Sequence, residues 1–201
     1  MGWQLHQNIG IDIGLSYLRG SAITRSVETF DFKTVEELRG QMFRLSPELK
    51  VKLGFQRIRA YTHLGFIIGI RPSIKSVVNS TDGTNESYSE FIYNKGSSLG
   101  ATAAISIEWP LTKRLFLSSS IRTHIHAYGP KRRERTVSTR NGDDRLDEFS
   151  TSQRYTIFHK DYQRGRTNNR DIPTEESISY YTFNSIGLQL GLIYYLKAPT
   201  P

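Results

Sequence analysis

Cysteine is absent from the 201 residues, which excludes disulfide bridges, thiol catalysis and Cys-based zinc sites. Long apolar runs are missing too. The longest stretch without a polar side chain, Leu64 to Ile70, has seven residues, whereas a membrane-spanning helix needs roughly 20. Residues 1–8 lack the basic start, apolar stretch and small-residue cleavage site of a secretory signal, and His6 replaces the Ser or Thr of the N-myristoylation pattern. The chain is therefore expected to be cytoplasmic, a mature exported protein, or a fragment without its front.

Aromatic and basic residues are plentiful by comparison. Tyr (11) and Phe (10) supply most of an 11% aromatic content, which argues against a long disordered tail, and the net charge is +8. The length suits a single all-β domain. We predict one domain over residues 1–197 and a short C-terminal tail over residues 198–201.

Hydrophobic residues alternate with polar ones in six segments, which indicates strands with one apolar and one polar face. No apolar face carries a charge. The six predicted strands cover residues 3–17, 43–55, 58–70, 99–109, 115–127 and 186–196.

The links between these strands alternate in length. Residues 18–42, 71–98 and 128–185 are long links, whereas the links at residues 56–57 and 110–113 are tight. This alternation is typical of an antiparallel up-and-down β-barrel with loops at one rim and turns at the other. No substantial helix is predicted; residues 34–39 form at best a short turn.

Alternation alone does not say whether the apolar faces meet lipid or a core. Three features favour a transmembrane barrel of the outer-membrane type: strands of roughly 11–15 residues, aromatic rings near their ends, and small residues on the polar faces. The rings are Trp3, Tyr17, Phe43, Phe55, Trp109 and Tyr194. The small residues are Gly10, Gly14, Gly54, Gly65, Gly69, Gly100, Gly187 and Gly191.

Several of these segments resemble the small outer-membrane β-barrel domain family common in Bacteroidetes, over its C-terminal portion. The segments are residues 8–17, 43–50, 60–66 and 185–192, together with the long hydrophilic segment 129–162. The resemblance implies an outer-membrane barrel and supplies no shared catalytic residues. The chain departs from the family at its end, since it finishes on residues 195–201 rather than on an aromatic residue.

Strand number bears on barrel closure, because single-chain barrels have an even number of strands and at least eight. Six strands leave an open edge, so we expect two further strands and a signal peptide upstream of Met1. The alternative is that the link at residues 128–185 contains another strand pair, around residues 131–140 and 153–162. This pair could instead extend the barrel above the membrane as a hairpin.

Histidines and serines supply the candidate chemistry. His124 and His126 lie two apart on one strand face and could bind a metal, and His6 and His63 share the polar face. Ser118 or Ser120 with His124 and Glu108 could form a Ser-His-carboxylate site. Ordinary polar residues of a barrel interior explain both sets more simply, so we predict no catalytic, cofactor or metal site.

Charges on the polar faces are expected to pair into a ladder inside the barrel. They are Asp12, Arg44, Glu48, Lys50, Lys52, Arg59, Glu108 and Arg122. Basic runs at residues 131–135 and 164–166 are expected in solvated loops, where they could contact lipid phosphates; no aromatic platform or DNA-binding motif accompanies them. The pairs Asp82-Gly83 and Asn141-Gly142 predict tight turns.

The sequence thus predicts a non-enzymatic outer-membrane protein that is structural or binds a partner through residues 18–42, 71–98 and 128–185. The expected contacts are outer-membrane lipid, lipopolysaccharide and an external partner, but not nucleic acid. A lipid-modifying barrel enzyme of the outer leaflet and a soluble ligand-binding barrel are the alternatives.

Overall fold

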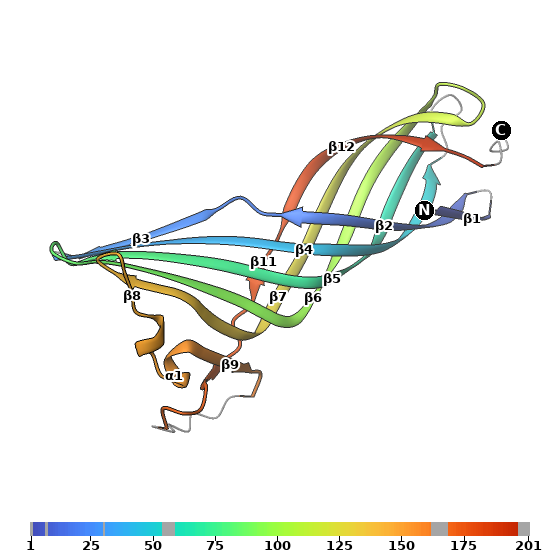
Figure 1. Ribbon diagram of the computed structural model, residues 1–201. Helices are drawn as coiled ribbons and strands as arrows, with labels where there is room; N and C mark the ends of the chain where they lie inside the picture. Colours follow the sequence, from blue (N-terminus) through green and yellow to red (C-terminus); the bar gives the residue numbers. More distant parts are fainter. Residues whose placement is uncertain (1, 7, 30, 54–58, 162–168, 197–201) are drawn as a thin grey trace.

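A single sheet of 12 strands makes up most of the computed structural model, which confirms the all-β prediction (Figure 1). Its strand pairs are antiparallel except for β9 and β10, which pair in parallel. The structure describes residues 2–6, 8–29, 31–53, 59–161 and 169–196. The strands are β1 (Gly2–His6), β2 (Ile9–Arg19), β3 (Ile23–Thr29), β4 (Phe32–Leu53), β5 (Arg59–Thr81), β6 (Glu86–Pro110), β7 (Leu115–Arg140), β8 (Asp143–Asp144), β9 (Tyr155–His159), β10 (Thr174–Ser177), β11 (Tyr181–Thr182) and β12 (Ser185–Tyr194). A 3₁₀ turn η1 (Leu146–Glu148) and a one-turn helix α1 (Thr151–Arg154) complete the described elements.

The long strands follow one another as an antiparallel meander. Strand β2 pairs with β4, β4 with β5, β5 with β6 and β6 with β7. Strand β12 then pairs with the other edge of β7. The tight turn predicted at residues 110–113 is confirmed, since the backbone N–H groups of Leu111 and Thr112 donate to the carbonyl oxygen of Leu115. The turn predicted at residues 56–57 lies outside the described residues, as does the tail at 198–201.

The prediction of one continuous strand over residues 3–17 is wrong. It consists of β1 and β2, which form a hairpin that turns at Asn8. Asparagine favours turns because its side chain competes locally for backbone hydrogen bonds. The period-2 pattern continues on both sides of this turn, so the alternation did not reveal it.

The three long links are mostly not loops. Strands β4, β5, β6 and β7 are 22, 23, 25 and 26 residues long, so each continues far into a segment predicted as a link. The short turn predicted at residues 34–39 is wrong because these residues belong to β4. Polar residues occupy both faces of these extensions, which hides the strand period.

Both predicted hairpin turns are confirmed by their backbone conformation. Asn141 and Gly142 have φ of 52° and 87°, and Gly83 has φ of 85°. Positive φ at these positions suits the tight turns that join right-twisted strands. The proposed strand pair in the last link is confirmed in part: residues 131–140 continue β7, and β9 pairs with β7 at Arg132–Glu134.

A kink divides the sheet into two halves. Arg71 on β5 and Lys95 on β6 have φ of 51° and 50° at neighbouring positions of the two strands. Before the kink, His63 and Ile67 face the buried side of β5; after it, Ile74 and Ser76 do. The side-chain phase therefore shifts by one residue at the kink.

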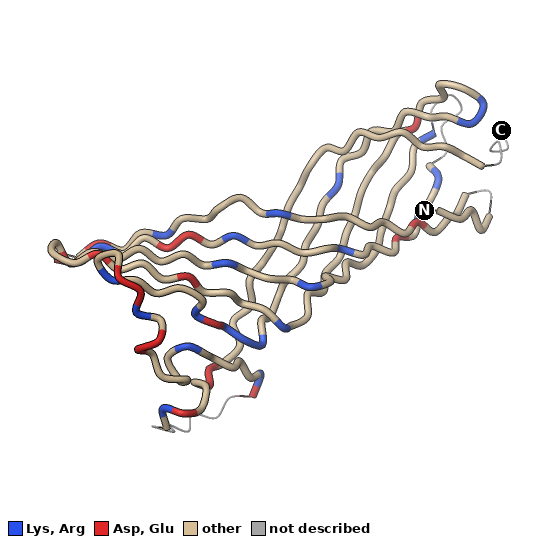
Figure 2. The backbone as a smooth tube through the Cα atoms, viewed as in Figure 1, with Lys and Arg blue, Asp and Glu red and all other residues tan. Residues whose placement is uncertain are grey.

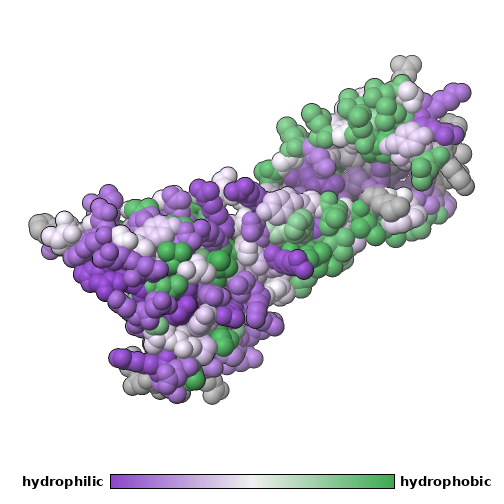
Figure 3. Space-filling view, in the orientation of Figure 1, coloured by the Kyte–Doolittle hydropathy of each residue, from purple (hydrophilic) through white to green (hydrophobic). Residues whose placement is uncertain are grey.

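The half that holds both described chain ends, which we call the apolar half, carries aliphatic residues on its exposed face (Figures 1 and 3). It comprises β1, β2, β12 and residues 41–53, 59–70, 98–110 and 115–127. The other half, the polar half, carries most of the charged residues (Figure 2). It buries a small core of its own, made by Ile74, Tyr93, Tyr128 and Phe158. The kink thus separates a half whose apolar side chains face outward from a half whose apolar side chains are buried in a core.

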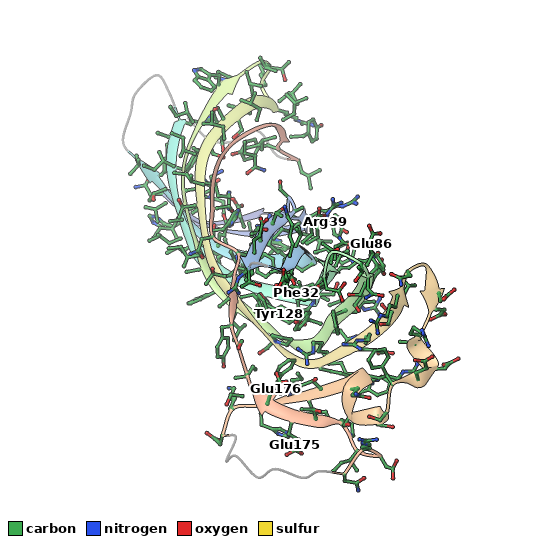
Figure 4. The ribbon with its side chains drawn as sticks, turned by 90° about the vertical axis from the view of Figure 1, so that its left-hand side faces the viewer. Phe32, Arg39, Glu86, Tyr128, Glu175 and Glu176 are labelled. Carbon is green, nitrogen blue, oxygen red and sulfur yellow. The ribbon has the colours of Figure 1, made fainter. Side chains whose placement is uncertain are left out.

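The sheet of the apolar half is curved into an open arc (Figure 4). Within the described residues, no backbone pairing joins β12 to β1 or β2, so these strands are the two edges. Barrel closure therefore stays a prediction. None of the described helical segments has the length and hydropathy to cross a membrane.

Candidate functional site

The concave face of the apolar half is polar because strand alternation turns the charged positions inward and the aliphatic ones outward. Charged side chains from non-adjacent strands meet across it, which confirms the predicted ladder for Lys50 with Glu108 and for Arg122 with Glu48. Arg44, Lys52 and Arg59, also predicted to pair, form no ion pair among the described residues. They form three levels along the strands, which we call the first, second and third rungs. The first rung lies nearest the residue 111–114 turn.

The first rung joins Lys50 on β4 to Glu108 on β6. Lys50 Nζ lies 2.5 Å from Glu108 Oε1, and the Glu108 side chain is fully buried. The hydroxyl of Tyr195 donates to the other Glu108 oxygen over 2.8 Å. The Tyr61 ring lies under the ammonium group, 3.9 Å from Nζ to the ring centroid. Each charge of this buried pair therefore has a second stabilising contact.

The second rung joins Arg122 on β7 to Glu48 on β4 through a hydrogen bond from Arg122 Nη1. His63 Nδ1 lies 3.6 Å from a Glu48 oxygen and 3.7 Å from an Asp12 oxygen. His63 Nε2 is 2.7 Å from the hydroxyl of Ser106. This rung therefore holds two carboxylates for one arginine, with a histidine between them.

The third rung contains donors but no carboxylate among the described residues. Arg44 lies four residues from Glu48 on β4, and His126 lies four residues from Arg122 on β7. Because β4 and β7 run antiparallel, both steps go in the same direction from the second rung, which puts Arg44 and His126 at one level with His124 beside them. Arg44 Nε donates to the neutral hydroxyl of Ser16 over 3.2 Å, and the buried Nη1 of Arg44 has no partner. Both ring nitrogens of His126, Nδ1 of His124 and the hydroxyl of Thr102 are also buried without a partner. The third rung thus holds five unpartnered buried polar atoms, whereas the second rung holds two, His63 Nδ1 and Arg122 Nε.

Phe183 lies over the third rung. Its ring stacks on the His126 ring with centroids 5.5 Å apart. It also reaches Gly40 on β4, where an added Cβ would lie 2.2 Å from Phe183 Cε1. The backbone of Phe183 stays on β7, where its N–H donates to the carbonyl oxygen of His126, and its side chain reaches across the concave face to β4. Nothing in the sequence pattern marked Phe183, because it lies in a segment predicted as a loop.

The metal site considered for His124 and His126 finds no third ligand. Within the part of the chain that the structure describes, no group of three His, Cys, Asp or Glu side chains could hold a metal ion. His6 is exposed on β1, away from the other histidines.

The considered site of Ser118, Ser120, His124 and Glu108 is not assembled. Ser120 and His124 are four residues apart on one strand, about 13 Å at strand spacing. Glu108 is engaged by Lys50 and Tyr195. The sequence reasoning missed instead that Ser106 and His63, on β6 and β5, lie within hydrogen-bond distance. These residues share a strand pair, but their register was not known from the sequence.

The basic run 131–135 lies in β7 rather than in a solvated loop, so that prediction is wrong. Arg133 donates to Thr156 over 2.8 Å and pairs with Glu176 at 3.4 Å. Arg135 lies over Phe91 and Phe149, at 5.0 and 4.1 Å from the ring centroids. Rings distant in the sequence thus supply the aromatic contacts that the run itself lacks. The second basic run, 164–166, lies outside the described residues.

The tip of the β5–β6 hairpin is held by Asp82. Its carboxylate accepts backbone hydrogen bonds from Asn85 at 2.7 Å and Thr84 at 3.1 Å. These bonds favour the charged form and lower the pKa of Asp82 to about 2. Farther down β6, hydrogen bonds from Lys75 and Tyr88 lower the pKa of Glu90.

The convex face of the apolar half is the exposed side of the aliphatic positions. Leu188, Phe66 and Ile105 are 80%, 71% and 60% exposed. Aromatic rings lie at both limits of this face: Tyr17 packs on Phe43 near the kink, with centroids 5.0 Å apart, and Trp109 and Tyr194 lie near the opposite end. The predicted arrangement of an apolar outer face and a polar inner face is therefore present.

Comparisons of the chain with protein-family models, curated proteins and solved structures find no match. Its function is therefore argued from its own geometry.

Proposed function

We propose that the protein is a non-enzymatic outer-membrane β-barrel protein whose apolar half lies in lipid and whose polar half projects from the membrane to contact a partner. The observation that carries this proposal is the exposed aliphatic face of the apolar half, opposite a buried face of paired charges. Monomeric soluble proteins rarely expose an apolar area of this extent. A transmembrane barrel requires it.

The height of the apolar face supports the proposal. From Leu99 to Trp109 the chain takes ten steps, which is about 33 Å along a strand. With a strand tilt of about 40°, this gives a height of about 25 Å, which matches the apolar band of outer-membrane barrels. The outward residues change to Arg71, Lys75 and Lys95 beyond that height.

The polar half supplies the surface for recognition. Its strands continue the sheet beyond the kink, and β9, β10 and α1 pack beside the extension of β7 (Figure 1). Figure 4 shows Glu175 and Glu176 on β10, far from the curved sheet of the apolar half. Because this half has its own buried core, it offers a fixed shape rather than three separate loops.

The test uses the chain's two tryptophans as depth probes. A Trp3→Phe variant in phosphatidylcholine vesicles leaves Trp109 as the probe, and we expect stronger quenching by lipids brominated near the headgroup than by lipids brominated near the chain end. With both native tryptophans changed to Phe, Ile105→Trp should show the reverse order. Lys75→Trp in the polar half, the matched control, should show little quenching.

Two results would contradict this proposal: equal quenching of the Ile105→Trp and Lys75→Trp probes, or a folded protein that stays in solution without detergent. The soluble ligand-binding barrel would then be favoured.

A hydrolase is the second candidate, because Ser106 Oγ and His63 Nε2 lie 2.7 Å apart with two carboxylates on the far side of the ring. A serine nucleophile needs such a base. However, both side chains are deeply buried, and the carboxylates lie beyond hydrogen-bond distance from His63 Nδ1. A fluorophosphonate probe that labels the native protein but not Ser106→Ala would favour this candidate; no labelling of either would support a structural role.

A further inference from the structure

We propose that the third rung binds a small oxyanion, a phosphate or carboxylate group, between Arg44 and the pair His124 and His126. The inference concerns the interior of the sheet and does not depend on the surface contacted by the polar half. It starts from the way charges are distributed over the three rungs.

Carboxylates balance the cations of the first two rungs but not of the third. Glu108 neutralises Lys50, and Glu48 neutralises Arg122 with Asp12 nearby. Arg44 has no ion-pair partner among the described residues, and its one hydrogen-bond acceptor is the neutral hydroxyl of Ser16. A guanidinium carries five N–H donors and no acceptor, so only an acceptor can satisfy the rest of it.

The side chains opposite Arg44 are also unsatisfied. His126 and Thr102 are each 3% exposed, yet neither ring nitrogen of His126 nor the hydroxyl of Thr102 has a partner. His124 is the direct neighbour of Thr102 across β6 and β7, and its Nδ1 is unpartnered as well. Buried polar groups nearly always have a partner in protein, ordered water or a bound ligand, so several unpartnered groups together mark a place for water or a bound group.

The ligand should be an oxyanion because Arg44 carries a positive charge and only donors, while each imidazole and the Thr102 hydroxyl can turn one donor toward the same group. Guanidinium, imidazole N–H and hydroxyl groups bind phosphate and carboxylate oxygens through charge-assisted hydrogen bonds. A cation would meet Arg44 and find no carboxylate on this rung among the described residues. Phe183 covers His126, which shields the site from bulk water and strengthens its electrostatic interactions.

The experiment titrates the detergent-solubilised, full-length protein with inorganic phosphate at constant ionic strength, while ¹⁵N spectra follow the ring nitrogens of His124 and His126. We expect saturable shifts of both rings and no such shift with chloride. A parallel titration uses dihexanoyl phosphatidic acid, a lipid that carries the same phosphate. Saturation by inorganic phosphate identifies a free anion as sufficient, and saturation by the lipid alone identifies a headgroup.

Arg44→Gln should weaken the apparent affinity about ten- to hundredfold, as expected for the loss of a charge-assisted bond. Arg44→Lys keeps the charge without the planar fork and should lie in between, which provides a second test if Arg44→Gln fails to fold. Lys75→Gln, in the polar half, is the matched control for lost positive charge and should bind like the native protein.

Two results would overturn the inference. One is the absence of saturable shifts with either ligand, which would leave only water on the third rung. The other is unchanged binding in Arg44→Gln. Both are independent of the depth measurements with tryptophan, so this inference and the membrane proposal can fail separately.

Discussion

Arg122 on β7 donates a hydrogen bond to Glu48 on β4, although β5 and β6 separate these strands in the sheet. A flat sheet would hold the two strands about 14 Å apart, which is three times the spacing of neighbours. The contact therefore shows how tightly the sheet curves. It also makes the buried charges part of what holds the curved sheet together.

Replacing one partner of this pair should be far more harmful than replacing both. Glu48→Met leaves a buried arginine without its anion, and we expect a loss of about 3–5 kcal/mol in the free energy of unfolding. The double variant Glu48→Met/Arg122→Met should recover most of this loss. Urea titration in detergent measures the free energy of unfolding of the native protein, the two single variants and the double variant. An additive double variant would show that the two residues do not interact.

The exposed pair Lys33 and Glu28 serves as the control for this comparison. Its side chains are 51% and 68% exposed, and surface pairs contribute about 0–1 kcal/mol.

A methyl group at Gly65 should force β4 and β5 apart. An added Cβ there would lie 2.2 Å from the carbonyl oxygen of Pro47 and 2.8 Å from Glu48 Cα. We expect Gly65→Ala to destabilise the protein by about 1–3 kcal/mol, the usual effect of overpacking. Gly187→Ala is the control, since no atom lies within 4 Å of its added Cβ. Equal unfolding midpoints in urea for the two variants would contradict this packing.

An arginine on the convex face should be penalised only if that face contacts lipid. Ile121 is 57% exposed in the middle of the part of β7 that belongs to the apolar half. In vesicles, Ile121→Arg should lower stability by about 2–4 kcal/mol. Asn79→Arg, exposed in the polar half, should change it by less than about 0.5 kcal/mol. Unfolding by denaturant in vesicles compares them, and a harmless Ile121→Arg would contradict the lipid contact.

The β5–β6 hairpin tip should be insensitive to mild acid. The pKa of Asp82 is lowered from 3.8 to about 2 because the turn donates to its carboxylate. A lowered pKa means that the charged form stabilises the turn above pH 3.8, and that this stabilisation is lost as the pH falls through about 2. The amide shifts of Thr84 and Asn85 should titrate near pH 2 by NMR. A midpoint near 4 would show that these hydrogen bonds are not formed.

A methyl group at Gly40 should displace Phe183 and expose His126, because the added Cβ would overlap the ring. We expect faster modification of His126 by diethyl pyrocarbonate in Gly40→Ala, and a similar rate in Phe183→Ala. Gly14→Ala, whose added Cβ would meet its nearest atom at 3.7 Å, is the matched control. Native rates in both test variants would mean that Phe183 does not cover the histidine.

The sequence by itself determined most strands of the apolar half, though not the turn between β1 and β2, as well as the two faces of each strand and the tight turns at Gly83, Asn141 and Gly142. These follow from local rules: a period of two residues and the backbone freedom of glycine and asparagine. It also indicated that Lys50, Glu108, Glu48 and Arg122 share the polar side, because alternation fixes the face of every residue.

Only the tertiary structure decided which of those residues meet. Ser106 reaches His63, and Arg122 reaches Glu48, because the register between strands and the curvature of the sheet bring them together. The kink at Arg71 and Lys95 likewise exchanged the residues that face inward with those that face outward. Beyond it, the polar segments predicted as loops are strands that surround a separate core. Register and curvature depend on contacts between residues distant in the chain, and a one-residue shift reverses every face, so local patterns cannot specify them.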